Sequence, residues 1–400
     1  MISSDEIKGR GREGVELRHC LKRPHKQISC PGSLARYRKG AVMLKIKRCV
    51  SIVSLAVLFL IAANVQSGFT AGITELKTSG QGEVSTFLVW DLIQKGWDKE
   101  AGLKITQIYF DSGMAQIEAL PSKQWVIGTS QGAVPSIVAA MRYGTYVIAI
   151  GDEDSFSNAV LVRPDSPIAK ATGADPKFPK TFGSAETVKG KTVLVTTVSS
   201  GHFSLATWLK RLGLKENDVV VKNMDQGQIM AAFESGVGDI AVVWEPYMFV
   251  GMSKGWKMVN EDSQIGANQI NTIIVEKEYA DTHPELVAKF LKLYFRRADL
   301  EKPDSSEMIN GYVKFLKDWA GTEMAKSDAA LSLKVRALYP LDQQLKYFDT
   351  SKGQSEVQKW FAAMGDFFVE QGKFSRAEMD KVMKSNFITD KFLKMAAEMK

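Results

Sequence analysis

The sequence predicts an α/β protein with two similar lobes around a cleft and a helical C-terminal tail. From residue 73 onwards, short apolar segments alternate with segments of helical spacing. Alternation of this kind is typical of a largely parallel sheet covered by helices. The alternation then occurs a second time with its parts in the same order. The chain of 400 residues is 45% hydrophobic and 24% charged, which provides enough apolar material for two buried cores.

The first run of elements lies between residues 73 and 150. Its first helix places Phe87, Leu92 and Trp97 near one side and ends before Gly102, a typical glycine C-cap. Pro121 ends a shorter second helix. The expected elements are strand 73–78, helix 84–99, strand 103–110, helix 114–120, strand 125–129, helix 134–143 and strand 146–150.

The second run repeats this order. Trp90 and Trp208 hold equivalent places in the two first helices, and Gly102 and Gly213 follow them. A weak internal duplication accounts for the match, and clefts between such lobes are favoured ligand sites. The expected elements are strand 192–196, helix 202–212, strand 219–222, helix 226–235, strand 240–244, strand 273–275, helix 283–294 and the tail helices 308–319, 343–348, 357–371 and 376–384.

The first 67 residues differ from the rest in charge and in cysteine content. They hold 13 lysines and arginines against four acids, whereas the remainder has 39 basic and 41 acidic residues. The formal charge of +7 therefore arises from the first 67 residues, and the rest of the chain lacks the excess of positive charge that nucleic-acid binding requires. Cys20, Cys30 and Cys49 all precede residue 68, so residues 68–400 offer no disulfide and no thiolate nucleophile.

Residues 43–67 have the layout of a secretory signal peptide. A cationic stretch at 45–48 precedes an uncharged apolar run at 50–63, and small residues suited to cleavage near Ser67 follow. The run is shorter than the roughly 20 residues of a spanning helix, although an anchor or a buried helix is the alternative interpretation. We interpret residues 1–42, which are polar and basic, as a non-native or disordered extension. The mature chain is therefore expected to be soluble and exported.

Three segments resemble one known family. Residues 228–247 read QIMAAFESGVGDIAVVWEPY. They are similar to the A-L-x-x-G-x-x-D-hydrophobic-W-[DE]-P-Y stretch of nitrate/sulfonate/taurine-type solute-binding proteins of ABC importers (SsuA/THI5-like, NMT1-like). Residues 111–120 resemble the family's x-x-S-G-x-x-x-x-x-A-L segment, and residues 196–214 resemble its strand, small-residue loop and helix. The chain departs from the family at 121–125, where a Gly-x-x-Asp turn is usual.

The resemblance implies the type II periplasmic-binding-protein fold, in which two crossover segments join two Rossmann-like lobes. We expect the crossovers near 150–158 and 259–271. The expected divisions are lobe I at 73–149 plus 260–340, lobe II at 159–258 and the helical tail at 341–400. The implied function is a periplasmic receptor that captures a small organic anion or zwitterion of sulfonate or taurine type. Its expected partner is an ABC permease at the inner membrane, and we expect it to be a monomer that binds no nucleic acid.

Two other functions stay open at this point. An enzyme on the same fold would resemble the thiamine-pyrimidine synthases, which depend on a Cys-rich segment and an active-site His. No cysteine follows residue 67, and His202 lacks a matching context. No phosphate loop, paired-carboxylate spacing or metal-ligand spacing stands out, so we expect no enzyme activity, no cofactor and no metal. The other open function is that of a binding protein whose two lobes present the solute to a sensor kinase instead of a transporter.

The candidate ligand residues follow predicted strands. Ligands of α/β lobes lie at the carboxyl ends of strands, where helix N-termini favour anions. The lobe II candidates before or on the first turn of such a helix are Thr197, Ser199, Ser200, Gly201 and His202. Ser199 or Ser200 could equally cap the helix, and His202 could simply be exposed. In lobe I the equivalent place holds Gln81 and Glu83, and the latter either faces the cleft or complements the helix dipole.

Four more candidates end strands. Trp244 and Glu245 lead into a proline turn, and Thr129 and Ser130 end a strand of lobe I as hydrogen-bond donors. A buried carboxylate needs a partner, which for Glu245 is a ligand ammonium or a salt bridge to the other lobe. Trp244 supplies either a cleft wall for a cation or ordinary core packing. The acidic run at 152–154 is interpreted as a solvated loop of the first crossover.

Overall fold

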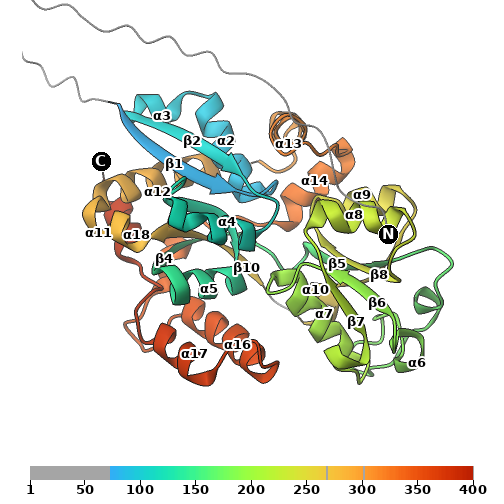
Figure 1. Ribbon diagram of the computed structural model, residues 1–400. Coiled ribbons are helices and arrows are strands. Elements are labelled where there is room, and N and C mark those ends of the chain that lie inside the picture. The colour runs from blue at the N-terminus through green and yellow to red at the C-terminus, as the bar shows by residue number, and fades with distance from the viewer. Residues whose placement is uncertain (1–72, 267–268, 301, 400) are drawn as a thin grey trace, which may run out of the picture. The chain divides into compact units, whose positions relative to one another are not determined.

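Two five-stranded sheets with helices packed against them form the described part of the chain, residues 73–266, 269–300 and 302–399 of a computed structural model (Figure 1). The predicted extension and signal peptide lie outside these residues. The strands of sheet A are β1 (Thr74–Gly80), β2 (Leu103–Tyr109), β3 (Ile127–Gly132), β4 (Thr145–Glu153) and β10 (Ile270–Glu276). Those of sheet B are β5 (Asn158–Val162), β6 (Thr192–Val195), β7 (Val220–Asn223), β8 (Ile240–Trp244) and β9 (Lys257–Glu261).

The two sheets share one topology. Sheet A has the order β2-β1-β3-β10-β4, and sheet B has the order β7-β6-β8-β5-β9. In each sheet the first three strands pair in parallel, and the fourth runs antiparallel to both of its neighbours. The shared order agrees with the predicted duplication, but both sheets are mixed, where the sequence predicts largely parallel pairing. The reason is that β5 and β10 enter their sheets directly from the other lobe, without the helical crossover that parallel neighbours require.

The helices pack on the sheets and form the tail. Their bounds are α2 (Val84–Gln94), α3 (Trp97–Glu100), α4 (Gly113–Ala119), α5 (Ala133–Tyr143), α6 (Ala185–Val188), α7 (Ser200–Arg211), α8 (Gln226–Glu234), α9 (Tyr247–Ser253), α10 (Asp262–Ile265), α11 (Lys277–Thr282), α12 (Pro284–Asp299), α13 (Ser306–Asp318), α14 (Lys326–Val335), α15 (Leu341–Phe348), α16 (Glu356–Glu370), α17 (Arg376–Met383) and α18 (Lys391–Glu398). Three 3-10 turns complete the set, η1 (Leu120–Ser122), η2 (Pro167–Lys170) and η3 (Glu216–Asp218). Among the described helices, none has the length and apolar character to cross a membrane.

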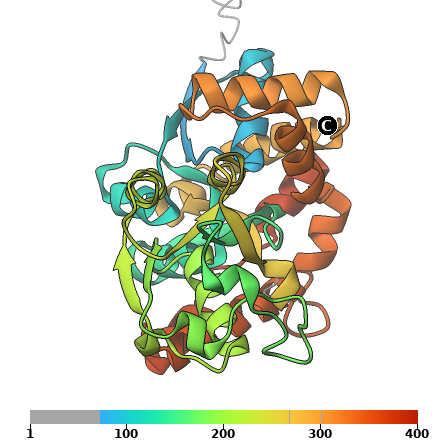
Figure 2. The same ribbon diagram turned by 90° about the vertical axis from the view of Figure 1, so that its right-hand side faces the viewer.

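The tail helices contact both lobes. In Figure 2 the segments after residue 300, coloured orange to red, run along one side of the view. Phe367 of α16 packs edge-on against Phe203 of α7 in lobe II, with ring centroids 4.8 Å apart. Residues 387–389 hydrogen-bond to Val147 of β4 in lobe I. The tail therefore bridges the lobes instead of extending from one of them.

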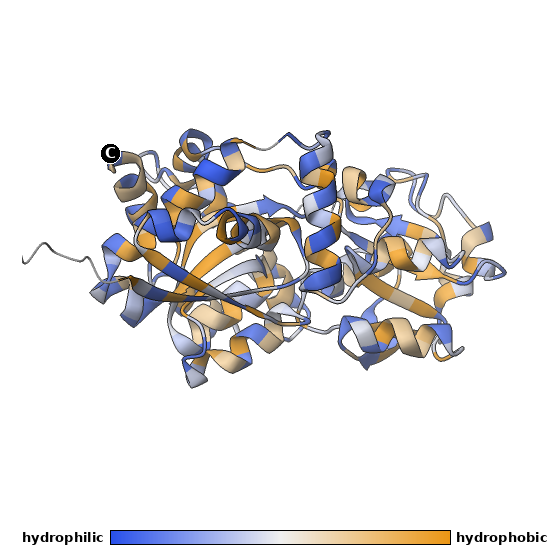
Figure 3. Cartoon of the chain, turned by 90° about the horizontal axis from the view of Figure 1, so that it is seen from above, coloured by the Kyte–Doolittle hydropathy of each residue, from blue (hydrophilic) through white to orange (hydrophobic). Residues whose placement is uncertain are grey.

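Apolar side chains fill both faces of the sheets. Along β8, Ile240 and Val242 belong to one buried cluster, whereas Ala241 and Val243 belong to another. Successive side chains of a strand point to opposite faces, so β8 is covered on both sides, as expected for a continuous apolar strand. Figure 3 shows orange strands within helices whose outer faces are blue. These packed layers hold the strand ends in place.

Gly80→Ala should destabilise lobe I, because the end of β1 has no room for a side chain. A Cβ at this position would overlap the Thr86 side chain and would lie 2.6 Å from Thr129 Oγ1. Overpacking of this kind costs about 1–3 kcal/mol, which urea unfolding would measure. The matched control is Gly227→Ala in α8, whose Cβ would sit 3.6 Å from Asp111 Oδ2 and would favour the helix. Equal stability of the two variants would contradict the prediction.

Candidate functional site

One buried arginine joins the two lobes. Arg336 directly follows α14, and its guanidinium contacts four carboxylates. Nη1 lies 2.9 Å from Asp152 Oδ1, 3.2 Å from Asp154 Oδ1 and 3.4 Å from Glu83 Oε2. Nε lies 2.9 Å from Glu245 Oε2. None of the five side chains is more than 5% exposed. We call these five residues the carboxylate cluster.

The two lobes supply the carboxylates from their strand ends. Glu83 follows β1 and is the N-cap residue of α2, whereas Glu245 directly follows β8 of the other sheet. Asp152 lies near the end of β4, and Asp154 begins the crossing from β4 to β5. The carboxyl ends of both sheets therefore meet at this point, which is where α/β folds bind ligands.

Two neutral side chains complete the cluster. Ser332 lies one helical turn before Arg336, on the same face of α14, and its hydroxyl donates to Glu245 Oε2 at 2.5 Å. Asn271 of β10 donates from Nδ2 to Glu83 Oε2 at 2.8 Å and to Asp152 Oδ1 at 3.1 Å. These donors reduce the cost of bringing like charges together out of water.

The cluster holds more negative groups than one arginine balances. Burial raises the pKa of Glu83 well above its usual value and raises that of Asp154 to about 6. Burial also raises the pKa of Glu245. Burial alone would lower the pKa of Arg336, but the surrounding carboxylates raise it well above its usual range. The arginine therefore stays charged, and the site favours protons or a further cation.

Two buried polar atoms of the cluster have no hydrogen-bond partner among the described residues. They are Glu245 Oε1 and Arg336 Nη2. Buried polar groups are normally hydrogen-bonded, so these atoms mark where the cluster is incomplete. The described part of the chain contains no group of three or more His, Cys, Asp or Glu arranged to hold a metal ion.

The lobe I candidates lie together beside the cluster. Gln81 Nε2 donates to the carbonyl oxygen of Ser130. Ser130 Oγ lies 2.8 Å from Ser85 Oγ and 2.6 Å from Thr86 Oγ1, and the latter is 2.9 Å from Thr129 Oγ1. Ser130 has a left-handed backbone with φ 55°. The predicted donors are thus close to one another, and at present they satisfy each other.

The lobe II candidates surround the start of α7. Ser199 caps this helix, since its hydroxyl accepts from the backbone N–H of His202 at 3.2 Å. Ser200 Oγ donates to Asn158 Oδ1 at 3.0 Å. Asn158 in turn donates to Asp262 Oδ2 at 2.9 Å, which places the helix start one side chain away from a further buried carboxyl. Gly201 is buried in the first turn.

The turn before α7 has an unusual backbone. Thr197 donates its N–H to Asn223 Oδ1 at 2.8 Å, and Val198 adopts φ 57°. A left-handed conformation is a genuine outlier for a β-branched residue, and such strain concentrates at functional sites. Both this turn and Ser130, which lies within β3, belong to segments that the sequence singles out.

His202 is packed into the protein away from the cluster. His202 Nδ1 accepts from the N–H of Val198 at 3.0 Å, and Nε2 lies 3.0 Å from Glu216 Oε2. The His202 ring also meets Phe368 of α16 edge-on. The hydrogen bond from His202, with help from Lys373, lowers the pKa of Glu216 to about 2. This environment supports a structural role for His202 in holding the tail.

Trp244 is 5% exposed, and its backbone N–H donates to Gln226 Oε1 at 3.1 Å. Its ring lies against the start of α7, where a Cβ on Gly201 would be 3.6 Å away. Trp244 therefore packs under the loop of the lobe II candidates.

The lobes also meet beyond the cluster. Tyr247 of lobe II donates to Asp111 Oδ1 of lobe I at 3.2 Å, and Tyr109 donates to the same oxygen at 2.6 Å. A Cβ on Gly132 would lie 3.8 Å from the Cβ of Ser200. The two lobes thus contact each other through Asp111 and Tyr247, and Gly132 of β3 lies close to Ser200 of α7.

Sequence reasoning missed three members of the cluster. It predicts a solvated loop at 152–154, but Asp152 is fully buried and Asp154 is 2% exposed. Arg336 lies 184 residues from Asp152, and no local pattern links them. A signal was present in the sequence, because the apolar strand β4 leads directly to Asp152 and Asp154. Side chains at the end of a strand that is buried on both faces are themselves shielded from solvent.

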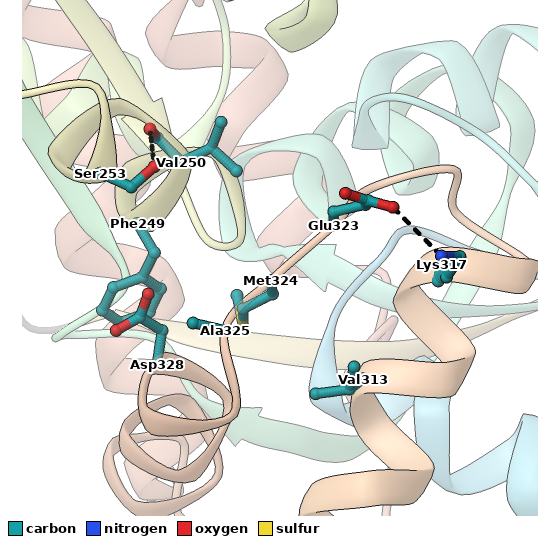
Figure 4. Close-up of a pocket in the computed structure, with 9 residues that line it drawn as sticks. All are labelled: Phe249, Val250, Ser253, Val313, Lys317, Glu323, Met324, Ala325 and Asp328. Atoms are coloured by element: carbon teal, nitrogen blue, oxygen red, sulfur yellow. Dashed lines mark hydrogen bonds and ion pairs between the residues drawn. The ribbon is translucent and has the colours of Figure 1, made fainter.

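A separate cavity lies beside α14. It has a volume of about 390 Å³ and is lined by α9, α13 and the segment that leads into α14 (Figure 4). Phe249 and Val250 of α9 lie across from Met324 and Asp328, and Lys317 pairs with Glu323 at its edge. The cavity leaves open space between lobe II and the start of α14.

Comparison with known proteins points to one family. A family model described as NMT1/THI5 like matches residues 92–300. A protein of Brachyspira hyodysenteriae, whose name describes an ABC transporter periplasmic binding protein, is 29% identical over 275 residues, which are 67% of this chain and 79% of that protein. The taurine-binding periplasmic protein of Escherichia coli is 28% identical over 197 residues, which are 48% of this chain and 56% of that protein.

Solved structures show the same fold. The alkanesulfonate-binding protein SsuA from Xanthomonas axonopodis pv. citri, solved bound to MOPS, has a TM-score of 0.62 at 18% identity and covers 80% of this chain and 99% of its own. The periplasmic nitrate-binding protein NrtA from Synechocystis PCC 6803 has a TM-score of 0.65 at 12% identity, with coverages of 82% and 89%. The expected type II periplasmic-binding-protein fold is confirmed.

Asp154→Asn should flatten the pH dependence of stability in weak acid. The pKa of Asp154 rises from 3.8 to about 6 on folding, so the folded protein holds this proton more tightly than the unfolded chain. Its contribution is complete below pH 3.8 and is lost as the pH rises through about 6. The neighbouring Glu83 and Glu245 act in the same direction. The unfolding temperature of the wild type should therefore fall more steeply over this range than that of the variant.

Calorimetry at a series of pH values checks this expectation, and parallel curves would contradict it. Glu216→Gln is the matched control. The pKa of Glu216 is lowered from 4.5 to about 2, so its contribution is present above pH 4.5 and is lost as the pH falls towards 2. This control should alter only the more acidic part of the curve.

Proposed function

Because the chain belongs to the NMT1/THI5-like family, whose model spans residues 92–300, we propose that it is an exported solute-binding protein. In this proposal it captures a small zwitterion between its lobes and delivers it to an ABC importer. The relatives named above are periplasmic binding proteins, and one of them is named for taurine binding. The proposal therefore concerns binding and not catalysis.

The choice of solute rests on one observation, which is that Glu83 and Glu245 both contact the guanidinium of Arg336. One lobe supplies each carboxylate, and both lie within 3.4 Å of the Arg336 guanidinium. Two further acids stand against the same cation. An excess of buried negative charge disfavours a bare anion and favours a solute with an ammonium or guanidinium group.

The start of α7 supports a negatively charged second end of the solute. This helix has 12 residues, and its N-terminal N–H groups and dipole favour negative charge. Ser200 at its start is linked through Asn158 and Gln269 to Asp262, which lies outside the carboxylate cluster. Asn158 also contacts Asp154 of the cluster, at 3.5 Å. A positive and a negative group on one short molecule match these two neighbouring environments. Aminosulfonates such as taurine have this form.

A solute that carries an amine should bind more tightly than the same solute without it. Taurine and ethanesulfonate form a matched pair, because they differ only by the amino group. Loss of one partner of a buried charge pair costs about 2–5 kcal/mol, so ethanesulfonate should bind at least about tenfold more weakly by calorimetric titration. Taurine at about 100 times its dissociation constant should add roughly 2.7 kcal/mol to the free energy of unfolding.

The same two solutes should also be compared on Glu245→Gln, because this variant removes one negative charge and keeps the side-chain shape. Its affinity for taurine should fall by more than about tenfold, with a smaller effect on ethanesulfonate. Equal affinities for the two solutes, or tight binding of nitrate alone, would be evidence against the zwitterion.

Export should remove the N-terminal segment. The order of cationic stretch, apolar run and small residues in 43–67 predicts cleavage near Ser67. Mass spectrometry of the periplasmic fraction should find a new N-terminus between residues 64 and 72. Leu58→Arg places a charge in the apolar run and should retain the precursor in the cytoplasm. Full-length wild-type protein in the cytoplasm would overturn the expectation.

A further inference from the structure

One face of α14 places a cation of the protein itself among the inter-lobe carboxylates. Arg336 and Ser332 both contact Glu245, at 2.9 and 2.5 Å. The same guanidinium donates to Asp152 of lobe I at 2.9 Å. The arginine side chain is 0% exposed, although it comes from a segment that belongs to neither sheet. Its charge and its planar donors are those of a guanidinium solute.

The arginine does not satisfy the site that it fills. The side chains of Glu245 and Arg336 are both fully buried. Among the described residues, Glu245 Oε1 and Arg336 Nη2 nevertheless have no hydrogen-bond partner. Four carboxylates around one cation leave negative charge in excess. Glu245 Oε1 lacks a hydrogen-bond donor among the described residues. This is a second indication, besides the excess negative charge, that the cluster accepts a cationic group whose donors are arranged differently from those of Arg336.

The segment that carries Arg336 borders a cavity. The cavity of about 390 Å³ lies beside the start of α14 and is lined by Phe249 of α9 and by Met324, Ala325 and Asp328 (Figure 4). The connection from α13 includes Gly321, which has φ 66°. Phe249 and Met324 are buried side chains of the cavity lining, so a displacement of α14 into this space would require them to shift.

We propose that the carboxylate cluster is a subsite for a guanidinium or ammonium group, and that Arg336 occupies this subsite until a solute displaces it. The inference rests on the proposed solute-binding function and names the residue that competes with the solute. Exchange of one cation for another conserves the charge balance of the buried site, whereas a neutral or anionic solute cannot replace the arginine. Binding is therefore coupled to withdrawal of Arg336 and movement of α14.

The test removes the arginine and offers a small cation in its place. Arg336→Ala should lower the unfolding temperature of the mature chain, because four carboxylates then lack their cation. Methylguanidinium at millimolar concentration should restore it in a saturable manner. Its dissociation constant for the variant should be at least tenfold lower than for the wild type, in which Arg336 competes. Urea is the matched neutral probe, since it is planar and nearly isosteric with the guanidinium group of methylguanidinium. It should not restore the unfolding temperature of the variant.

Arg297→Ala is the matched control variant. Arg297 is also buried, at 4% side-chain exposure, and its Nε lies 2.6 Å from Asp91 Oδ2, away from the carboxylate cluster. The control should be destabilised and should not respond to methylguanidinium. Equal rescue of both variants, rescue by urea, or no rescue of Arg336→Ala would overturn the proposal.

A second measurement applies if Arg336→Ala does not fold. Hydrogen exchange of the wild type with saturating methylguanidinium should then become faster across 326–335, and unchanged exchange would count against displacement. The outcomes for the two proposals are separable. Rescue by methylguanidinium without binding of any zwitterion retains the cation subsite and removes the proposed solute. Tight taurine binding that is equal in wild type and Arg336→Ala removes the competition and retains the solute.

Discussion

The arrangement of both lobes depends on one guanidinium among four carboxylates. Removal of a charged group from water costs several kcal/mol, so a cluster of this kind persists only where its members are held by the fold. Arg336 is the one cation within 4 Å of Glu83, Asp152, Asp154 and Glu245 among the described residues. Without it, carboxylates of the two lobes would repel each other across the junction. The same interaction therefore links the two lobes and gives the site its chemical character.

The mixed topology of the sheets explains why the carboxylates meet. In each sheet the fourth strand is the one that follows a strand of the other sheet in the sequence, β5 after β4 and β10 after β9, so the two crossings run between the lobes. The crossing from β4 to β5 carries Asp154, and β10 carries Asn271 just after the return crossing. Strand ends of both sheets lie beside these crossings. A site built from strand ends and crossings responds to any change in the angle between the lobes.

The fold is shared with proteins whose printed names describe alkanesulfonate and nitrate binding. Fold alone does not define the solute, because function depends on the side chains placed on it. In this chain the distinguishing feature is supplied by α14. Arg336 and Ser332 come from α14, which lies beyond the residues matched by the family model. The solute preference of this protein is therefore expected to depend on a segment outside the matched part.

The sequence alone was sufficient for the α/β class, the two similar runs of elements and the loops that line the junction. Those features depend on local periodicity, on glycine and proline positions and on segments such as Trp244-Glu245, which are visible within about ten residues. The sequence predicts one continuous helix over 84–99, but the structure divides it into α2 and α3, because Gly96 adopts φ 74° between them. The burial of Asp152, the role of Arg336 and the antiparallel fourth strands were decided by tertiary structure. Each depends on contacts between residues far apart in the chain, and the electrostatic partner of an acid carries no local signal.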